Sequence, residues 1–432
     1  MYSDLHNHLY GCLSAETLWE IGRKNRHPKW ERFIPEYKKV FGKEINPDSF
    51  FETYSRPEKL GELYWFRKPG PFAEFQCSFN LIIALSVFDE EEIYEAARRT
   101  ALEHYHDGVS YAEYRLMYSP AAGEADYVRK SLSACRGLKK AEEESGGKFQ
   151  GRLAVSLYRN SYWKEYEWLK KLQDSDNTAK QYITGIDFCF IEEGFPPREK
   201  KEFFLKVKED NILKPDGALA ILYHVGESFQ DKSALSSCRW VIESAESGAH
   251  RLGHCIALGI RPEIYRDRKI TESAEERRDQ IRFMLKNYEE IRSFGPVSER
   301  CELEKELEDI TSLKNDEKIN YHYSQKNMAE LETFQKFGME RIKKTDAVIE
   351  SCPTSNLLIG MITEKKDLPV FRFIENGMKL VLGSDDPGIF RTDLKSEFKI
   401  LSECGVRAET LERIRQNGFL YKSENLSGRK NG

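Results

Sequence analysis

Two histidines near the start of the chain, His6 and His8, are spaced so that both can face the same way. They stand in MYSDLHNHLYG, directly after a short and half-apolar stretch, YSDL. In a β-strand, side chains two residues apart leave the same face of the sheet. Two imidazoles on one face are a common arrangement for binding a metal ion. The spacing also arises often by chance, so HNH alone is a weak signal.

Five further groups with useful chemistry follow other short apolar stretches. They are His224 and Glu227 in YHVGE, His254 in RLGHC, and Asp385 and Asp386 in GSDDPG. Each motif alone has an ordinary explanation, because a lone histidine at a strand end is usually structural and DDPG is typical of a turn before a helix. Together, four of the nine histidines and two adjacent acids suit metal binding and acid–base chemistry, provided that the fold brings them to one edge.

The stretches that carry these motifs belong to a set of eight short apolar segments. Each is rich in Val, Ile, Leu or Tyr, and they lie at 2–8, 110–117, 152–158, 182–189, 218–225, 249–255, 347–352 and 379–385. Helix-like segments such as 89–108 and 235–248 separate most of them, and both end in glycine, a common helix stop. Strand–helix alternation repeated eight times predicts an α/β protein, a (β/α)8 TIM barrel. Catalytic groups of such barrels lie at the C-terminal ends of the strands, so these motifs are expected at one rim.

Two connections are longer than a simple strand-to-helix crossover. Residues 9–88 follow the first strand and hold enough apolar and aromatic residues to pack as a helical cap. After the sixth strand, 326–344 is predicted as the barrel helix, which leaves the Glu-, Lys- and Arg-rich segment 260–325 as a charged helical insertion. This insertion is interpreted as a solvated decoration or, because it leaves the catalytic end of a strand, as a lid or specificity wall. It is also a candidate surface for a second copy of the chain or a protein partner.

A second His-x-His motif lies elsewhere in the chain, as HYH at 104–106. It falls at the end of the helix predicted over 89–108, just before a strand, and therefore at the opposite face of the barrel. His104 and His106 are interpreted as structural residues.

The bulk properties exclude several classes of protein. With 432 residues, 40% apolar and 32% charged, the chain is long enough for a single barrel domain over 1–432 with insertions. Its net charge of −5 and the lack of a basic stripe argue against nucleic acid, and no apolar run is long enough to cross a membrane. Nine cysteines without a C-x-x-C pair are typical of reduced thiols, and the metal pair beginning at His6 leaves no room for a signal peptide. We therefore expect a cytoplasmic protein.

Seven sequence blocks in order resemble the adenosine deaminase family of metal-dependent hydrolases. They are DLHNHLYG, YAEYR, GID, HVGE, RLGHC, ESCPTSN and LGSDDPGIF, which match the family's H-x-H-L-[DE]-G, Y-x-E-x-R, strand-four GID, H-A-G-E, R-[IL]-G-H-G, E-x-C-P-x-S-N and S-x-[NS]-[TS]-D-D-P patterns. Order and spacing fit, apart from the insertion between RLGHC and ESCPTSN. The chain lacks the P-C-x-x-C motif of the separate zinc deaminase class that acts on bases in nucleic acid.

The resemblance implies a role for each residue of the rim. One Zn²⁺ per chain would be held by four protein ligands, His6, His8, His224 and Asp385, with an open position for water. His254 would orient the water and Asp385 would help to take its proton. Glu227 would protonate a ring nitrogen of an aminopurine, which makes the amine-bearing carbon electrophilic. Asp386 would bind the N7 side of the purine.

The chain departs from the family at two positions that contact the substrate. The residue after H-x-H-L is acidic in adenosine and adenine deaminases, and here it is Tyr10. The family's G-I-D-x-x-G has a glycine whose backbone meets the purine, and Phe190 stands there in this chain. Both are therefore predicted to line and reshape the substrate pocket. Loss of the carboxylate would suit a more anionic ligand such as a nucleotide, with Arg56, Lys59, Arg67, Lys68 and Arg159 as unselective basic candidates.

Two further groups of polar residues are expected to support the site. Glu113 and Arg115, in YAEYR, are expected to pair with each other or with neighbouring loops and to shape the rim. Ser351, Ser355 and Asn356, in ESCPTSN, are expected to cap the following helix and to brace the metal ligands.

Three functions remain open at this point. The first is zinc-dependent hydrolytic deamination of a 6-aminopurine compound, either a nucleoside, a deoxy or phosphorylated derivative, or adenine. The second is a related amidohydrolase-type metal enzyme acting on another C–N bond, which Phe190 keeps open. The third is a non-catalytic deaminase-like effector subunit that docks through 260–325, although a complete set of ligands argues against it.

Overall fold

Eight parallel strands form the centre of the molecule. The computed structural model describes residues 1–119, 121–360 and 362–430. The strands pair in the order in which they occur, as β1 (Tyr2–His8), β2 (Val109–Met117), β3 (Gln150–Ser156), β4 (Ile183–Asp187), β5 (Ala220–Val225), β6 (Arg251–His254), β9 (Val348–Ser351) and β10 (Leu380–Leu382). Their residues are almost all buried, as expected when helices cover one side of a sheet and packed side chains fill the other. The predicted (β/α)8 barrel is confirmed.

The barrel closes between its last and first strands. His8 N donates to Asp385 O at 2.9 Å, and Asp385 N donates to His6 O at 2.8 Å. These two bonds form a parallel bridge just beyond the end of β10. The closure therefore brings GSDDPG directly beside HNH, although almost the whole chain separates the two motifs.

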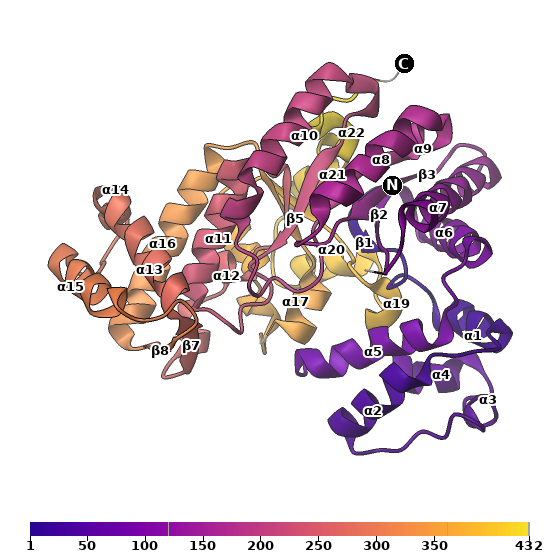
Figure 1. The fold of residues 1–432 in the computed structure, drawn as a ribbon, viewed down its shortest axis with the longest axis horizontal. Coiled ribbons are helices and arrows are strands. Elements are labelled where there is room, and N and C mark those ends of the chain that lie inside the picture. Colours follow the sequence, from indigo (N-terminus) through magenta and orange to yellow (C-terminus); the bar gives the residue numbers. More distant parts are fainter. Residues whose placement is uncertain (120, 361, 431–432) are drawn as a thin grey trace.

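Helices surround the barrel and connect its strands (Figure 1). They include α6 (Glu90–His106), α7 (Glu124–Glu144), α8 (Tyr162–Ser175), α9 (Asn177–Tyr182), α10 (Lys201–Leu213), α11 (Ala234–Ser247), α12 (Ile256–Gly259), α16 (Gln325–Lys343), α17 (Pro353–Ile359), α18 (Pro369–Glu375), α19 (Pro387–Phe390), α20 (Leu394–Glu403), α21 (Ala408–Leu420) and α22 (Ser423–Leu426). Four 3₁₀ turns lie at Pro197–Lys200, Pro215–Gly217, Pro262–Tyr265 and Lys365–Asp367. The helix predicted over 326–344 forms as α16.

Helix α6 begins and ends as its sequence indicates. Asp89 caps the helix by accepting from Glu92 N at 2.8 Å, and three glutamates occupy the first turn, where the helix dipole favours negative charge. His104 and His106 lie in the last turn. His104 is buried, and its Nδ1 lies 2.7 Å from the hydroxyl of Tyr114 on β2. His104 therefore packs in the barrel wall, whereas His106 is exposed.

A group of five helices follows β1 and lies at the lower right of Figure 1. They are α1 (Ala15–Lys24), α2 (Trp30–Phe41), α3 (Phe50–Thr53), α4 (Pro57–Tyr64) and α5 (Phe72–Leu85). The Tyr64 hydroxyl donates to Leu13 O at 2.7 Å, and Phe66 N donates to Ile389 O at 2.9 Å. The ring of Phe75 stacks on that of Phe390 at 5.4 Å. The last two contacts join the cap to α19, which follows Asp385 and Asp386.

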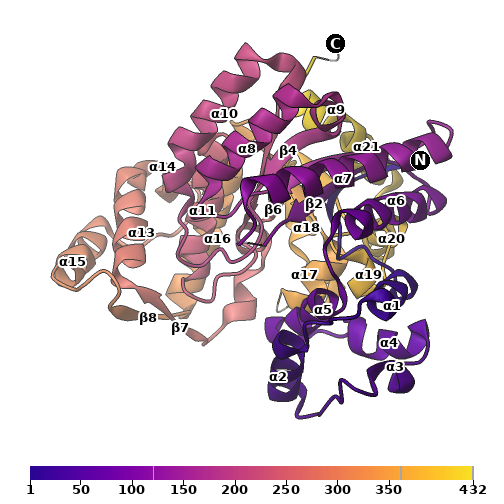
Figure 2. The same ribbon diagram turned by 45° about the vertical axis from the view of Figure 1, so that its right-hand side comes forward.

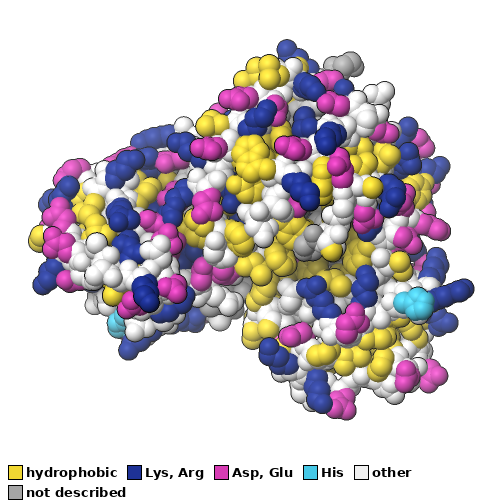
Figure 3. Space-filling view, in the orientation of Figure 1, with side chains coloured by type: hydrophobic (Ala, Val, Ile, Leu, Met, Phe, Trp, Pro, Cys, Tyr) yellow, Lys and Arg dark blue, Asp and Glu magenta, His cyan; other side chains and the backbone are white. Residues whose placement is uncertain are grey.

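The segment after β6 forms a separate lobe, at the left of Figure 1 and still apart from the cap in Figure 2. Its helices are α13 (Ala274–Lys286), α14 (Tyr288–Arg292) and α15 (Arg300–Thr311), and they pack toward α11 and α16. It also holds an antiparallel pair of strands, β7 (Lys269–Ser273) and β8 (Lys318–His322). The charged helical insertion predicted over 260–325 thus also contains two strands, which were not foreseen because each has only five residues and one buried side chain. Acidic and basic side chains intermix over this lobe (Figure 3).

The core is continuous from the cap through the barrel to the insertion. Seven of the nine cysteines are buried, and Cys301 and Cys404 are exposed. Among the described residues, no helix is both long and apolar enough to span a membrane.

Candidate active site

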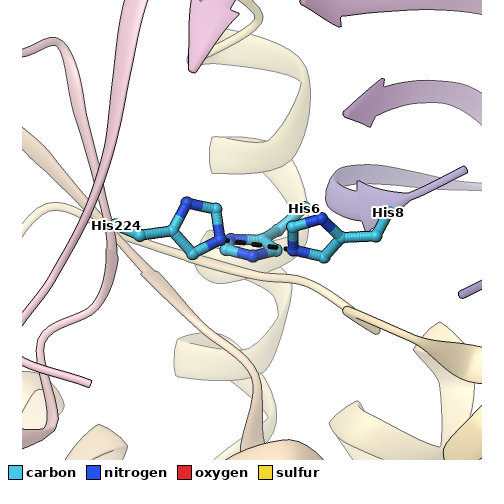
Figure 4. A group of neighbouring side chains, drawn as sticks. All are labelled: His6, His8 and His224. Carbon is cyan, nitrogen blue, oxygen red and sulfur yellow. Dashed lines mark hydrogen bonds between the residues drawn. The ribbon is translucent and has the colours of Figure 1, made fainter. Parts of the chain in front are cut away.

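The histidines predicted at the strand ends lie together inside the rim of the barrel. His6 and His8 come from β1, His224 from β5 and His254 from β6. The ring centroid of His6 lies 4.8 Å from those of both His224 and His254, and 5.6 Å from that of His8. Figure 4 shows the rings of His6, His8 and His224 turned toward one another. The Nε2 atoms of His8 and His224 are 3.3 Å apart.

Asp385 joins this cluster from the turn after β10. Its Oδ1 lies 3.5 Å from His6 Nε2 and 3.3 Å from His8 Nε2. Asp385 has a φ of +63° and His254 a φ of +62°, in the left-handed region. This backbone costs about 1–3 kcal/mol at each residue, so the packed barrel must hold both residues in place.

A single metal ion would fit among four atoms: the Nε2 atoms of His6, His8 and His224 and Oδ1 of Asp385. Ligands bound about 2.0–2.1 Å from zinc at tetrahedral angles lie about 3.4 Å apart, close to the separations just described. His6 Nε2 is buried and has no hydrogen-bond partner among the described residues, which is costly unless a ligand reaches it. Burial lowers the pKa of His224 to about 3 and also lowers the pKa of His6, so both rings are neutral and can bind a cation. The donor set, three imidazoles and one carboxylate, is one that zinc prefers.

A buried hydrogen-bond acceptor holds the far nitrogen of three of the rings. His6 Nδ1 lies 2.8 Å from Glu350 Oε2, and His224 Nδ1 lies 3.0 Å from Asp187 Oδ1. His254 Nδ1 lies 3.0 Å from Asn356 Oδ1. Each bond favours a proton on Nδ1 and leaves Nε2 pointing to the centre of the site. Asn356 thus braces His254, and it lies within α17, whose N-cap is Cys352.

The roles of Glu350 and Asp187 were missed by sequence reasoning. Both stand at strand ends, in the blocks ESCPTSN and GID, so the rule that identified the histidines would also have found these two acids. Their carboxylates are fully buried. Arg115 and Arg251 keep the pKa of Glu350 well below its usual value despite burial, so its carboxylate stays charged.

Glu113 and Arg115 do not pair with each other. They lie two residues apart on β2, and each reaches a charge on a strand that is not paired with β2, Arg115 on β9 and Glu113 on β6. Arg115 Nη2 donates to Glu350 Oε2 at 2.5 Å, and Arg251 Nε donates to Glu350 Oε1 at 2.6 Å. Arg251 also donates to Glu113, whose Oε1 accepts from Ser423 N at 2.7 Å. Because all four charged groups are buried, each needs an opposite partner, and the network runs through the barrel centre to His6.

Glu227 faces the same centre from the loop after β5. Its Oε1 lies 3.4 Å from His254 Nε2, and its side chain is 22% exposed. Burial raises the pKa of Glu227 to about 7, so near neutral pH much of it carries a proton. Burial opposes a charged His254, but the nearby carboxylates of Glu227 and Asp385 outweigh this effect and raise its pKa. The pair therefore places an acid and a base next to Asp385.

Asp386 lies beside Asp385 with one oxygen free. Its Oδ1 is buried and has no hydrogen-bond partner among the described residues. Burial, with Asp385 and Glu227 nearby, raises the pKa of Asp386 well above its ordinary value. A Cβ added at Gly11 would lie 1.7 Å from this Oδ1, so the glycine of HNHLYG leaves room for the carboxyl group.

The structure does not bring Tyr10 or Phe190 into this cluster. Tyr10 is 6% exposed, and its hydroxyl donates to Glu92 Oε1 at 2.9 Å while its ring packs on Phe88. Phe190 is 58% exposed, with its ring 6.2 Å from that of Tyr158. Its φ of +72° is one that glycine adopts readily, which fits the glycine of the family pattern.

Arg159 is not free to bind a phosphate, because it is buried. Its Nη2 donates to the carbonyl oxygens of Phe188 at 2.7 Å and His224 at 2.8 Å. Arg159 therefore fixes the backbone around His224, and it is no longer a candidate for binding the substrate.

Comparisons with known proteins agree with this geometry. A family model described as adenosine deaminase matches residues 335–424, which include ESCPTSN and LGSDDPG. Along its whole length the chain is similar to an adenosine deaminase of Shewanella loihica, at 23% identity, covering 98% of this chain and 95% of the relative. The chain is thus similar to adenosine deaminases. These matches support a hydrolytic deaminase that acts on C–N bonds.

Solved structures share the fold of this adenosine deaminase-like chain. An amidohydrolase from Burkholderia ambifaria with bound Zn is similar at a TM-score of 0.54 and 13% identity, covering 98% of this chain and 85% of that one. The Arabidopsis protein ADAL complexed with GMP is similar at a TM-score of 0.56 and 16% identity, covering 98% and 92%. At these identities the likeness concerns the barrel and its connections.

Proposed function

We propose that the chain is a zinc-dependent aminohydrolase that converts a 6-aminopurine compound and water to the 6-oxopurine and ammonia. The observation that carries the proposal is the meeting of His6, His8, His224 and Asp385 around one point, with Glu227 and His254 beside it. The matches to adenosine deaminases support deamination of a 6-aminopurine. The zinc ion, one per chain, is supported by the donor set and by the zinc in a structural relative.

The four ligands named above would hold the zinc, and bound there it makes a water easier to deprotonate near neutral pH. Asp385 would take the proton that this water loses, and His254 would orient the water. Glu227, protonated in part near neutral pH, donates to the ring nitrogen next to the amine-bearing carbon, so that this carbon accepts the oxygen. The C–N bond then breaks as the proton taken by Asp385 passes to the amine, which leaves as ammonia, and the proton of the added hydroxyl returns to Glu227. Asp386 binds the purine through its free oxygen.

The substrate is proposed at the level of a class, as a 6-aminopurine base, nucleoside or nucleotide. Tyr10 and Phe190 stay predictions as substrate contacts, at the positions where the family has an acid and a glycine. The carboxylate that would repel a phosphate is replaced at position 10. In the relative that binds GMP the ligand is a nucleotide, and this favours including phosphorylated compounds in any substrate screen.

A substrate panel tests this proposal. Adenosine, deoxyadenosine, adenine, AMP, ATP and N6-alkylated analogues are incubated with the zinc-loaded protein. Ammonia release and the absorbance change from adenine to hypoxanthine are followed for each compound. We expect turnover of at least one compound, and no turnover of any of them would overturn the assignment.

Glu227→Gln identifies the acid in the same assay. The variant keeps the size of the side chain and removes the proton donor, so we expect kcat to fall by about 10²–10⁴-fold with zinc content unchanged. Equal activity in this variant would remove Glu227 from the mechanism.

A further inference from the structure

The loop that joins β5 to α11, residues 226–233, carries Glu227 and is held at its beginning by one buried carboxylate. Glu192, which is 3% exposed, reaches this loop from the connection after β4. Its Oε2 accepts from Gly226 N at 2.9 Å, and its Oε1 accepts from Glu227 N at 2.9 Å and from Ser228 N at 3.1 Å. Three consecutive backbone N–H groups thus converge on one charged group. Such charge-assisted bonds are among the stronger ones in proteins.

The far end of the same loop is held by the insertion. Glu272 of β7 is fully buried, and its Oε2 accepts from Ser233 N at 3.0 Å and from the Ser236 hydroxyl at 2.9 Å. The Tyr323 hydroxyl, just after β8, accepts from Ala234 N at 2.7 Å. Both contacts lie at the first turn of α11, where backbone N–H groups have no partner within the helix. The small β7–β8 sheet therefore supplies groups that fix where this loop ends.

Between these two anchors, Glu193 also holds the loop, because its Oε1 accepts from the Ser228 hydroxyl and from Gln230 N. The side chain of Glu227 is partly exposed and makes one close contact, at 3.4 Å, with His254. Where its carboxyl group lies therefore depends on the backbone of the loop. Displacement of a reacting group by about 1 Å can slow catalysis by about 100-fold.

We propose that Glu192 and Glu272 are positioning residues for Glu227, and that the insertion thereby forms part of the catalytic apparatus. Glu192 fixes the backbone of the acid itself, and Glu272 fixes the end of its loop. This inference rests on the proposed function for the role of Glu227 as the acid. The hydrogen bonds that carry the inference are independent of that role.

Two variants and a matched control test the inference in the zinc-loaded full chain. Glu192→Gln keeps the size of the side chain but turns an NH₂ group toward one of the three N–H donors. We expect its kcat to fall by about 10–100-fold, with KM within about threefold and zinc content unchanged. Glu272→Gln acts through the loop end, so we expect a smaller loss in kcat, of about three- to tenfold.

The control is Glu165→Gln, at a carboxylate that holds a different loop of the same rim. Glu165 is 9% exposed, and it accepts from Tyr158 N at 2.8 Å and from the Ser161 hydroxyl at 2.7 Å. A merely structural role predicts equal kcat losses in the three variants. We expect Glu165→Gln to keep kcat within about twofold, so a kcat for Glu192→Gln that equals the control overturns the inference. A kcat for Glu272→Gln that equals the control removes the insertion from it.

Hydrogen–deuterium exchange separates this inference from the proposed function. We expect Glu192→Gln to accelerate amide exchange in 226–228 while exchange in β5 stays unchanged. Unchanged exchange in 226–228 overturns the inference even if the enzyme is active. A wild-type protein that turns over no purine overturns the proposed function and leaves the exchange result interpretable. If Glu192→Gln does not fold, Glu192→Asp, which keeps the charge and shortens its reach, takes its place.

Discussion

The chain contains two His-x-His motifs whose surroundings differ sharply. His6 and His8 lie at the C-terminal end of β1, where three other strands bring His224, His254 and Asp385. His104 and His106 lie at the end of α6, where His104 meets only the hydroxyl of Tyr114. Burial lowers the pKa of both His6 and His104, so burial does not distinguish them. Among the described residues, His6 Nε2, which faces the common centre, has no hydrogen-bond partner, and this difference marks the candidate site.

Replacing one histidine from each motif gives the largest expected contrast. His6→Gln removes a predicted ligand, so we expect the purified protein to lose bound zinc and all measurable turnover. His104→Gln keeps a hydrogen-bonding group near Tyr114, so we expect zinc content to stay at one per chain. Zinc is measured by mass spectrometry after gel filtration. Full zinc occupancy in His6→Gln would show that His6 is not a zinc ligand and would contradict the difference between the two motifs.

The carboxylate of Glu350, which holds Nδ1 of His6, provides a second test with a smaller expected effect. Glu350→Gln keeps the shape of the side chain but weakens the bond that orients His6, so we expect zinc affinity to fall by about 10–100-fold. Affinity is measured by competition with a chelator. Glu276→Gln is a suitable control, because Glu276 is also a largely buried acid paired with an arginine, Arg239, and it belongs to the insertion. We expect the control to bind zinc as the wild type does, and equal losses in both variants would remove Glu350 from the site.

The smallest effect concerns the pH dependence of stability at the second motif. Burial lowers the pKa of His104 to about 4, from about 6.5 in the unfolded chain. Between these values the unfolded state binds more protons, so His104 contributes stability that is present above pH 6.5 and is lost as pH falls toward 4. We expect His104→Gln to reduce the dependence of the free energy of unfolding on pH within this window. Denaturant unfolding at several pH values measures it, and an unchanged slope would contradict the prediction.

The barrel and the members of its rim were predictable because they depend on local patterns. Apolar runs bounded by turns gave eight strand positions, and helix signals such as Asp89 and the glutamates after it marked the helices between them. Once strands alternate with helices, the ends of all strands lie at one rim, so HNH, HVGE, RLGHC and GSDDPG had to meet. The resemblance to the adenosine deaminase family then supplied roles for the same residues.

The surroundings of these residues were less predictable. Glu113 and Arg115 were expected to pair with each other or with neighbouring loops, but each has its partner on another strand. The β7–β8 sheet was missed because its strands are short and mostly exposed. The hydrogen bond from the Tyr10 hydroxyl to Glu92 of α6 was not foreseen. In each case the deciding contact joins segments far apart in the chain.

The sequence by itself determined the order of strands and helices and which chemical groups stand at the strand ends. Periodic burial and turn residues act over a few neighbouring residues, and these are visible in the order of amino acids. Only the tertiary structure decided that Glu350 and Asp187 orient the histidines and that Glu192 and Glu272 hold the loop of Glu227. Such contacts depend on which side chains the closed barrel and its packed lobes bring within about 3 Å of each other, and local patterns carry no information about them.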